Sequence, residues 1–325
     1  MMPQVDPEAR ALALQAWLCA DPLEKALAAR TLQSDWVQGR LSLSLTLSQI
    51  LSQTLNQTLN RTLNRTSGHP AQNTADLATP GRPVRPRLVA AGSVPNRPAN
   101  SAAGRIALMH AIAHIEFNAI DLALDAIWRF DGMPQAYYAD WMLVADEEAQ
   151  HFLLVCEWLA GQDASYGDCD AHDGLWQMAA RTAHDPLARM ALVPSVLEAR
   201  GLDATPMIQE RLRRNAADMR NARDLSAVAA IEDALTILDR ILNDEIGHVR
   251  IGRQWFEWLC AQDGLAPEAT FDALMEKFNA PWPKPPVNRT ARLAAGFSEA
   301  QLDRFSQADR PSAHSGRGKL RAQST

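Results

Sequence analysis

Two short stretches, Ala145-Asp146-Glu147-Glu148-Ala149-Gln150-His151 and Asn243-Asp244-Glu245-Ile246-Gly247-His248, decide the fold that we predict for this chain. In each stretch a Glu is followed three residues later by a His. Residues i and i+3 are neighbours on one face of an α-helix. Each stretch, if helical, therefore presents one carboxylate and one imidazole to the same point.

Both Glu-x-x-His pairs lie at the centre of an apolar helix face. At about 100° per residue, the side chains within about 60° of each Glu are almost all apolar. They are Trp141, Val144, Ala145, Phe152, Val155 and Leu159 around Glu148, and Leu238, Ile241, Leu242, Val249, Gly252, Phe256 and Leu259 around Glu245. A charged group on a buried apolar face is unfavourable unless it is paired or bound to a metal. Neither face carries a Lys or Arg, so the pattern indicates a metal.

Two further carboxylates, Glu116 and Glu198, lie on the apolar faces of two other predicted helices. Four Glu and two His in this helix order are typical of carboxylate-bridged di-iron or di-manganese bundles. Carboxylates can bridge two cations, and imidazoles complete the ligand set. We expect Glu116, Glu148 and His151 to hold one ion. The predicted ligands of the other ion are Glu198, Glu245 and His248, with Glu148 and Glu245 bridging.

Other polar residues have simpler interpretations. His110, His114, Asp121 and Asp125 share the opposite side of their helix from Glu116, where solvent or loop contacts are expected. Asp173 is expected to cap the helix that follows it. Glu147 and Asp244 each precede a predicted ligand; they can orient a ligand imidazole or simply face solvent. Trp141 and Trp255 lie close to the ligand turns and are candidates for lining a pocket.

Composition places the chain in a broad class. It has 325 residues, 47% of them hydrophobic, and a formal net charge of −6. This charge gives no general attraction to nucleic acid or to anionic membranes. Four scattered Cys without a C-x-x-C pair fit a reducing cytosol better than a disulfide framework or zinc site. We predict a cytoplasmic protein with neither an export signal nor a membrane span.

The chain divides into five predicted regions. They are an N-terminal helical arm (1–40), a low-complexity insertion (41–66), a Pro-rich extended segment (67–100), a four-helix bundle (101–280), and an extended strap with a disordered basic tail (281–325). The insertion repeats Gln/Arg-Thr-Leu-Asn, which indicates a flexible or weakly helical repeat expansion.

The fold class predicted is all-α, since alternating strand patterns of useful length are missing from the sequence. Two helices are expected within 7–36, the second starting at Asp21-Pro22. The later helices are expected at 101–130, 135–161, 174–201 (bent or interrupted at Pro186 and Pro194), 206–221, 223–261 and 267–279.

Several segments between about residue 94 and 297 form a recognisable set. They are His114-Ile115-Glu116, Ala119-Ile120-Asp121-Leu122-Ala123-Leu124-Asp125, Glu147-Glu148-Ala149-Gln150-His151-Phe152, Tyr166-Gly167-Asp168, Ala171-His172-Asp173-Gly174-Leu175-Trp176, Val196-Leu197-Glu198-Ala199-Arg200-Gly201-Leu202-Asp203, Asp244-Glu245-Ile246-Gly247-His248-Val249, Ala291-Arg292 and Ala295-Gly296-Phe297. On these segments the chain resembles the DUF455 family of uncharacterised bacterial ferritin-like proteins. The resemblance implies a ferritin-like bundle with a dimetal centre at the six positions named above. It implies no established reaction.

Three functions are compatible with these residues. The first is an O2-activating oxidase or hydroxylase with two metal ions, Fe before Mn or a mixed Fe/Mn pair, served by an electron-donor protein. Its substrate is a small molecule or, by analogy with a tRNA hydroxylase branch of the ferritin-like superfamily, a modified nucleoside. The second is a non-oxygenating protein for metal storage or buffering. The third is a metal-free bundle in which the buried groups pair with one another.

Overall fold

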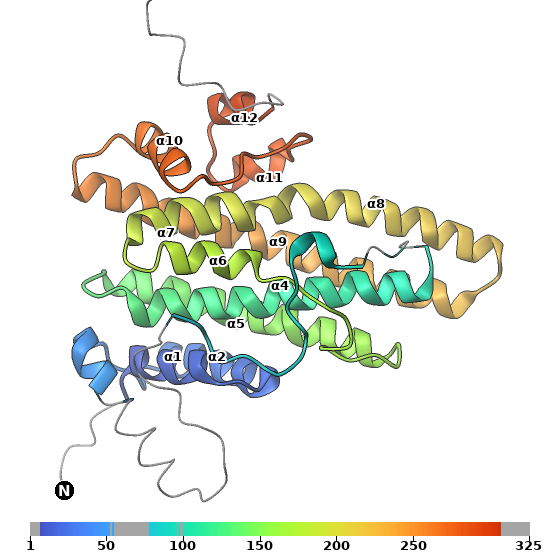
Figure 1. The fold of residues 1–325 in the computed structure, drawn as a ribbon, viewed down its shortest axis with the longest axis horizontal. Helices are drawn as coiled ribbons and strands as arrows, with labels where there is room; N and C mark the ends of the chain where they lie inside the picture. The colour runs from blue at the N-terminus through green and yellow to red at the C-terminus, as the bar shows by residue number, and fades with distance from the viewer. Residues whose placement is uncertain (1–6, 53, 55–77, 96, 98–99, 307–325) are drawn as a thin grey trace, which may run out of the picture.

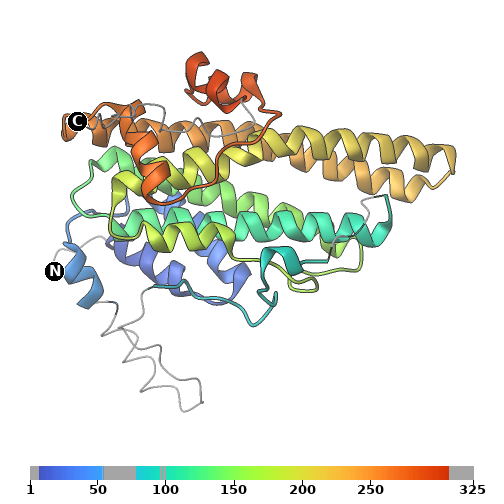
Figure 2. The same ribbon diagram turned by 45° about the horizontal axis from the view of Figure 1, so that its top comes forward.

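Helices form the framework of the computed structural model, which describes residues 7–52, 54, 78–95, 97 and 100–306 (Figures 1 and 2). Within these ranges there are two isolated β-bridges and no strand, which confirms the all-α prediction. The elements are α1 (Ala9–Leu18), α2 (Pro22–Val37), η2 (Ala91–Ser93), α4 (Ala102–Arg129), α5 (Gln135–Ala160), α6 (Gly174–Arg181), α7 (Pro186–Leu192), η3 (Val193–Glu198), α8 (Ala199–Asn221), α9 (Leu225–Gln262), α10 (Pro267–Lys277), α11 (Arg289–Ala294) and α12 (Glu299–Phe305).

A four-helix arrangement forms the centre of the molecule. Three of its members are the long helices α4, α5 and α9, and the fourth is the continuous run of α7, η3 and α8. α4 packs along α5, α5 packs on α9, and α9 packs on α7, η3 and α8. At one end α8 and α9 project together beyond the rest of the bundle (Figures 1 and 2). The predicted helices at 101–130, 135–161 and 223–261 are confirmed.

The fourth helix differs from the one predicted at 174–201. The chain breaks at 182–185 and then stays helical from Pro186 to Asn221, although Pro194 and Pro206 lie inside this run. A proline lacks the N–H that would bond the carbonyl four residues earlier. Side chains supply the missing donors: Ser195 Oγ donates to Met190 O (3.2 Å) and Asn288 Nδ2 donates to Leu202 O (3.1 Å). The predicted interruption between 201 and 206 is therefore wrong.

The N-terminal helices cover one side of the bundle. As predicted, the second begins at Asp21-Pro22, and the Asp21 carboxylate accepts from the amides of Leu23 and Glu24 (both 2.9 Å). α1 packs on α4, and α2 packs on α5. The buried Arg10 of α1 donates to the carbonyls of Ile127 and Trp128. It thereby satisfies the last turn of α4, whose carbonyls have no partner within the helix.

The C-terminal segment contains helices that the sequence analysis did not predict. α11 and α12 follow an irregular stretch at 278–288 and lie on the α8 and α9 side of the bundle (Figure 1). Half of the low-complexity insertion at 41–66, part of the Pro-rich segment and the basic tail from Arg310 fall outside the described residues.

Among the described residues, one helix, α4, is long and apolar enough to cross a membrane by length and composition. However, 72% of its most apolar window is buried inside the bundle, which is typical of a core helix.

Candidate metal centre

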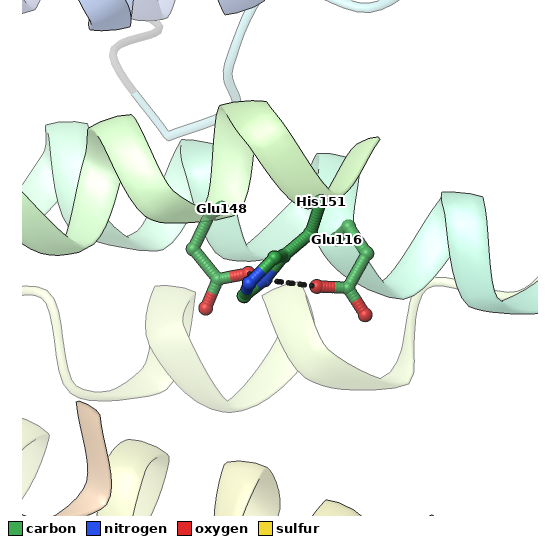
Figure 3. A group of neighbouring side chains, drawn as sticks. All are labelled: Glu116, Glu148 and His151. Carbon is green, nitrogen blue, oxygen red and sulfur yellow. Dashed lines mark ion pairs between the residues drawn. The ribbon is translucent and has the colours of Figure 1, made fainter. Parts of the chain in front are cut away.

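Four elements bring six predicted ligands into the interior of the bundle. Glu116 comes from α4, the first Glu-x-x-His pair from α5, Glu198 from the end of η3, and the second pair from α9. Five of the six are nearly inaccessible to solvent: Glu116, Glu148, His151, Glu245 and His248. Figure 3 shows Glu116 extending from α4 toward Glu148 and His151, which share one face of α5.

The ligand atoms form two tight groups that share one carboxylate. Glu116, Glu148 and His151 offer atoms that all lie within 4.8 Å of one another, and so do Glu148, Glu245 and His248. His151 Nδ1 lies 3.3 Å from Glu116 Oε2 and 3.5 Å from Glu148 Oε2. His248 Nδ1 lies 2.9 Å from the other Glu148 oxygen, Oε1. Glu148 is thus placed between the two groups, in the position of a bridging carboxylate.

Two details of the predicted arrangement differ from the geometry. Glu245 belongs to only one of the two groups, with its Oε2 4.0 Å from His248 Nδ1, so a bridging role for Glu245 has no geometric support. Glu198 belongs to neither group. It is partly buried, and the Glu148 carboxylate and the His248 ring are close enough to influence its pKa.

The outward nitrogen of each imidazole contacts a carboxylate of the opposite helix. His151 of α5 has its Nε2 2.9 Å from Asp244 of α9, and His248 of α9 has its Nε2 2.7 Å from Glu147 of α5. The side chains of both carboxylates are 28% exposed. Of the two interpretations left open for Glu147 and Asp244, the orienting contact is the one observed. A carboxylate at Nε2 holds a proton there and directs the Nδ1 lone pair toward the cluster.

Each of the six residues has a buried polar atom without a hydrogen-bond partner. These atoms are Glu116 Oε2, both oxygens of Glu148, Glu198 Oε2, Glu245 Oε2, His151 Nδ1 and His248 Nδ1. Nearly all buried polar groups in native proteins are hydrogen-bonded, so a concentration of such atoms in one place requires an explanation. All are potential metal-ligand atoms, and those of every residue except Glu198 meet in the two groups. The imidazole nitrogens among them lie 2.9–4.0 Å from carboxylate oxygens as ion pairs, an arrangement that also fits cations bound between these groups.

Burial and mutual repulsion strongly perturb these carboxylates. Burial, and then the charge of Glu148, raise the pKa of Glu116 and the pKa of Glu198 to about 8. Burial also raises the pKa of Glu245 well above its usual value. Glu148 shows the opposite direction, because the His248 and His151 rings outweigh its burial and lower its pKa. Burial and the charge of Glu148 thus favour the protonated form of the surrounding carboxylates, whereas the two imidazoles favour the ionised form of Glu148.

The imidazoles respond to the same charges. Burial alone would lower the pKa of His151, but its contacts with Asp244, Glu116 and Glu148 outweigh burial and raise this pKa to about 12. Among the described residues, no Lys or Arg forms an ion pair with any of the six predicted ligands. If all four carboxylates were ionised, two protonated imidazoles would leave two negative charges uncompensated in the bundle interior.

The polar residues on the side of α4 opposite Glu116 are buried. Of the two contacts expected for them, with solvent or with a loop, the structure shows loop contacts for two histidines. His110 Nε2 accepts from the amide of Gly167 (2.8 Å), and His114 Nδ1 lies 2.9 Å from the Tyr166 hydroxyl. These contacts confirm the loop-facing alternative. Deeper in the bundle, Asp121 pairs with the fully buried Lys25.

The expected helix cap at Asp173 is not observed, and the two tryptophans near the ligand turns lie in the core. The Asp173 side chain does not cap α6; its carboxylate pairs with Arg82 (2.8 Å), and His172 Nδ1 accepts from Gly174 N instead (3.3 Å). Trp141 and Trp255 are buried, and Trp255 Nε1 donates to Asp140 (2.9 Å).

Comparison with known proteins adds relatives without an assigned activity. A family described as "Protein of unknown function (DUF455)" matches residues 18–303. A Haemophilus influenzae protein named only "Uncharacterized protein" is 47% identical over 228 residues, covering 68% of this chain and 74% of the relative. No solved structure matches the chain.

Proposed function

The chain belongs to the DUF455 family, and we propose that it is a ferritin-like dimetal-carboxylate protein that activates O2 to oxidise an organic substrate. One observation carries this proposal: each of the six predicted ligands has a buried ligand-type atom without a hydrogen bond, five of the six meet in two groups, and Glu148 joins these groups. Two divalent cations would balance the charge of four ionised carboxylates while both imidazoles stay neutral.

The residues around the centre fit this role. Glu148 would bridge, Glu116 and His151 would hold one ion, and Glu245 and His248 the other. Asp244 and Glu147 would hold a proton on the outward nitrogen of each imidazole, so that its Nδ1 faces an ion. Two iron ions with hard oxygen ligands and imidazoles supply redox chemistry with O2 when coordination positions are left open.

The apolar faces that surround the ligands exclude water from this centre. Phe152 and Val155 of α5 and Val249 of α9 are completely buried. Water exclusion strengthens electrostatic interactions and limits side reactions of an oxidising centre.

Metal stoichiometry and O2 consumption test the proposal. The full chain, purified without chelator, is titrated anaerobically with Fe(II) and then exposed to O2. We expect two ions per chain, followed by O2 consumption and a change in visible absorbance. Glu148→Gln should lose tight binding of both ions, whereas E157Q, an exposed Glu on the same helix, should retain it.

Other outcomes would favour a different function. Uptake of many iron ions per chain into a very large assembly would point to storage. A wild-type protein that binds no ion, with unchanged stability after chelator treatment, would favour the metal-free bundle and refute the dimetal assignment.

A further inference from the structure

The turn that carries Glu198 has an unusual backbone. Val193–Glu198 is π-helical, and the amide of Ala199 donates to Pro194 O, five residues earlier. Pro194 provides no N–H for Met190 O, and the Ser195 hydroxyl takes its place. Single π-turns inside α-helices are frequently found at functional sites. Such a widened turn needs support from neighbouring elements to keep one geometry.

Arg292 of α11 supports this turn directly. Its side chain is completely buried, and its guanidinium donates to both carboxylate oxygens of Asp203 at 2.6–3.3 Å. It also donates to the carbonyl of Ala199 (3.1 Å), the residue that follows Glu198. Its planar face lies over the rings of Phe297 and Phe305. A planar fork held in this way fixes direction as well as distance.

Asn288, the N-cap residue of α11, binds the same stretch from one helical turn before Arg292. The backbone N–H of Asn288 donates to Asp203 Oδ1 (2.8 Å), and its side-chain amide donates to Leu202 O (3.1 Å). Leu202 O is the carbonyl that Pro206 leaves without a backbone donor. Asn288 and Arg292 therefore both donate to backbone carbonyls in the first turn of α8, directly after Glu198.

α9 supports the turn from another side. A Cβ atom on Gly252 would lie 2.3 Å from both Cβ and Cγ of Pro194. Only glycine allows the π-turn to approach α9 this closely. Gly252 lies one turn after His248, and Pro194 lies one turn before Glu198. The contact thus sets the distance between the helices that carry these two predicted ligands.

We propose that α11 positions Glu198, with Arg292 as the positioning residue that holds the π-turn against Gly252. This inference rests on the proposed function, because it assigns a purpose to the position of a metal ligand. It also gives a role to the C-terminal Ala291-Arg292 and Ala295-Gly296-Phe297 segments, which are remote in sequence from every predicted ligand.

Two measurements on the full chain test the inference. Hydrogen exchange of the chelator-treated protein reports whether residues 193–203 are held. Anaerobic Fe(II) titration reports the two ion affinities separately. The variants are R292A, R292K and, as a control, R289A, which removes another arginine of α11 whose partners Glu299 and Asp303 are exposed.

We expect R292A to exchange at least about tenfold faster at 193–203. We also expect R292A to bind the ion predicted at Glu198 and His248 about 10–100-fold more weakly. Its affinity for the ion predicted at Glu116 and His151 should be retained. R292K keeps the charge but not the fork, so it should show intermediate values, and R289A should match the wild type. If R292A does not fold, R292K decides: unchanged exchange and unchanged affinity in R292K overturn the inference.

The failure of the inference differs from the failure of the proposed function. If the wild type binds two ions and R292A matches R289A in both measurements, the positioning role is wrong and the proposed function is unaffected. If the wild type binds no ion, the proposed function fails and the ligand-positioning role fails with it. The exchange data then still show whether Arg292 holds the turn.

Discussion

Replacing Gly252 by Ala tests the packing that brings the Glu198 turn to α9. The added Cβ would lie 2.3 Å from Pro194, whereas ordinary contacts begin near 3.4 Å, so the two helices must separate by about 1.1 Å. Overpacking of this kind costs about 1–3 kcal/mol. Replacement of a helical Gly by Ala contributes up to about 1 kcal/mol in the opposite direction.

Gly247 provides a matched control on the same helix. It lies next to His248, and an added Cβ there would meet no atom within 4 Å. G247A should therefore stabilise the protein by up to about 1 kcal/mol, and G252A should destabilise it by about 1 kcal/mol. Urea unfolding of the two metal-free variants should show a difference of about 2 kcal/mol.

Metal titration provides the second readout for the same pair of variants. A shift of about 1 Å at the π-turn would displace Glu198 from His248. G252A should therefore bind the ion predicted at Glu198, Glu245 and His248 about 10–100-fold more weakly. G247A should bind both ions like the wild type. Equal stability and equal affinity in the two variants would refute the argument that Gly252 sets the spacing of these helices.

Three further predictions concern the surroundings of the centre. E147Q and D244N each remove a carboxylate from the outward nitrogen of a ligand imidazole, and each should weaken Fe(II) binding about 10–100-fold in anaerobic titrations; unchanged affinity would contradict the orienting role. Burial lowers the pKa of His114 to about 3, so the unfolded chain binds its proton first as the pH falls, and this side chain opposes folding below about pH 6.5. At pH 5 this loss of folding free energy approaches about 2 kcal/mol. H114Q should therefore lose less stability than the wild type between pH 7 and pH 5. The control H184Q, which changes an exposed His, should lose as much stability as the wild type. Chelator treatment should lower Tm, because an ion at 100 times its Kd contributes about 2.7 kcal/mol to the folded state; an unchanged Tm would count against bound metal.

The sequence was sufficient to predict the helices and the convergence of most of the site. Spacing placed Glu148 and His151 on one helix face, and the apolar residues around them predicted burial, which the structure confirms. Asp21-Pro22 predicted a helix start because the cap and the first-turn proline act locally. Such features depend on neighbouring residues alone and can therefore be read from one chain.

The errors occur where distant residues compensate for a local signal. The sequence predicted an interruption between 201 and 206, but Asn288, more than 80 residues away, donates to the carbonyl that Pro206 leaves without a backbone donor. Asp173 has the usual features of a helix cap, yet Arg82 binds its carboxylate. For His110 and His114 the sequence left solvent and loop contacts open, and the structure shows that the 165–173 loop is the partner that buries them. No local pattern contains information about these partners.

The same reasoning explains why Glu198, alone among the six predicted ligands, belongs to neither group of ligand atoms. Glu148, His151, Glu245 and His248 are fixed by regular α-helix, so their spacing alone determines where they point. Glu198 ends a π-turn whose shape depends on Ser195, on α9 and on α11. A residue placed by three elements moves when any one of them moves. The distance between Glu198 and the rest of the cluster should therefore respond to changes in α11, whereas the two Glu-x-x-His pairs should not.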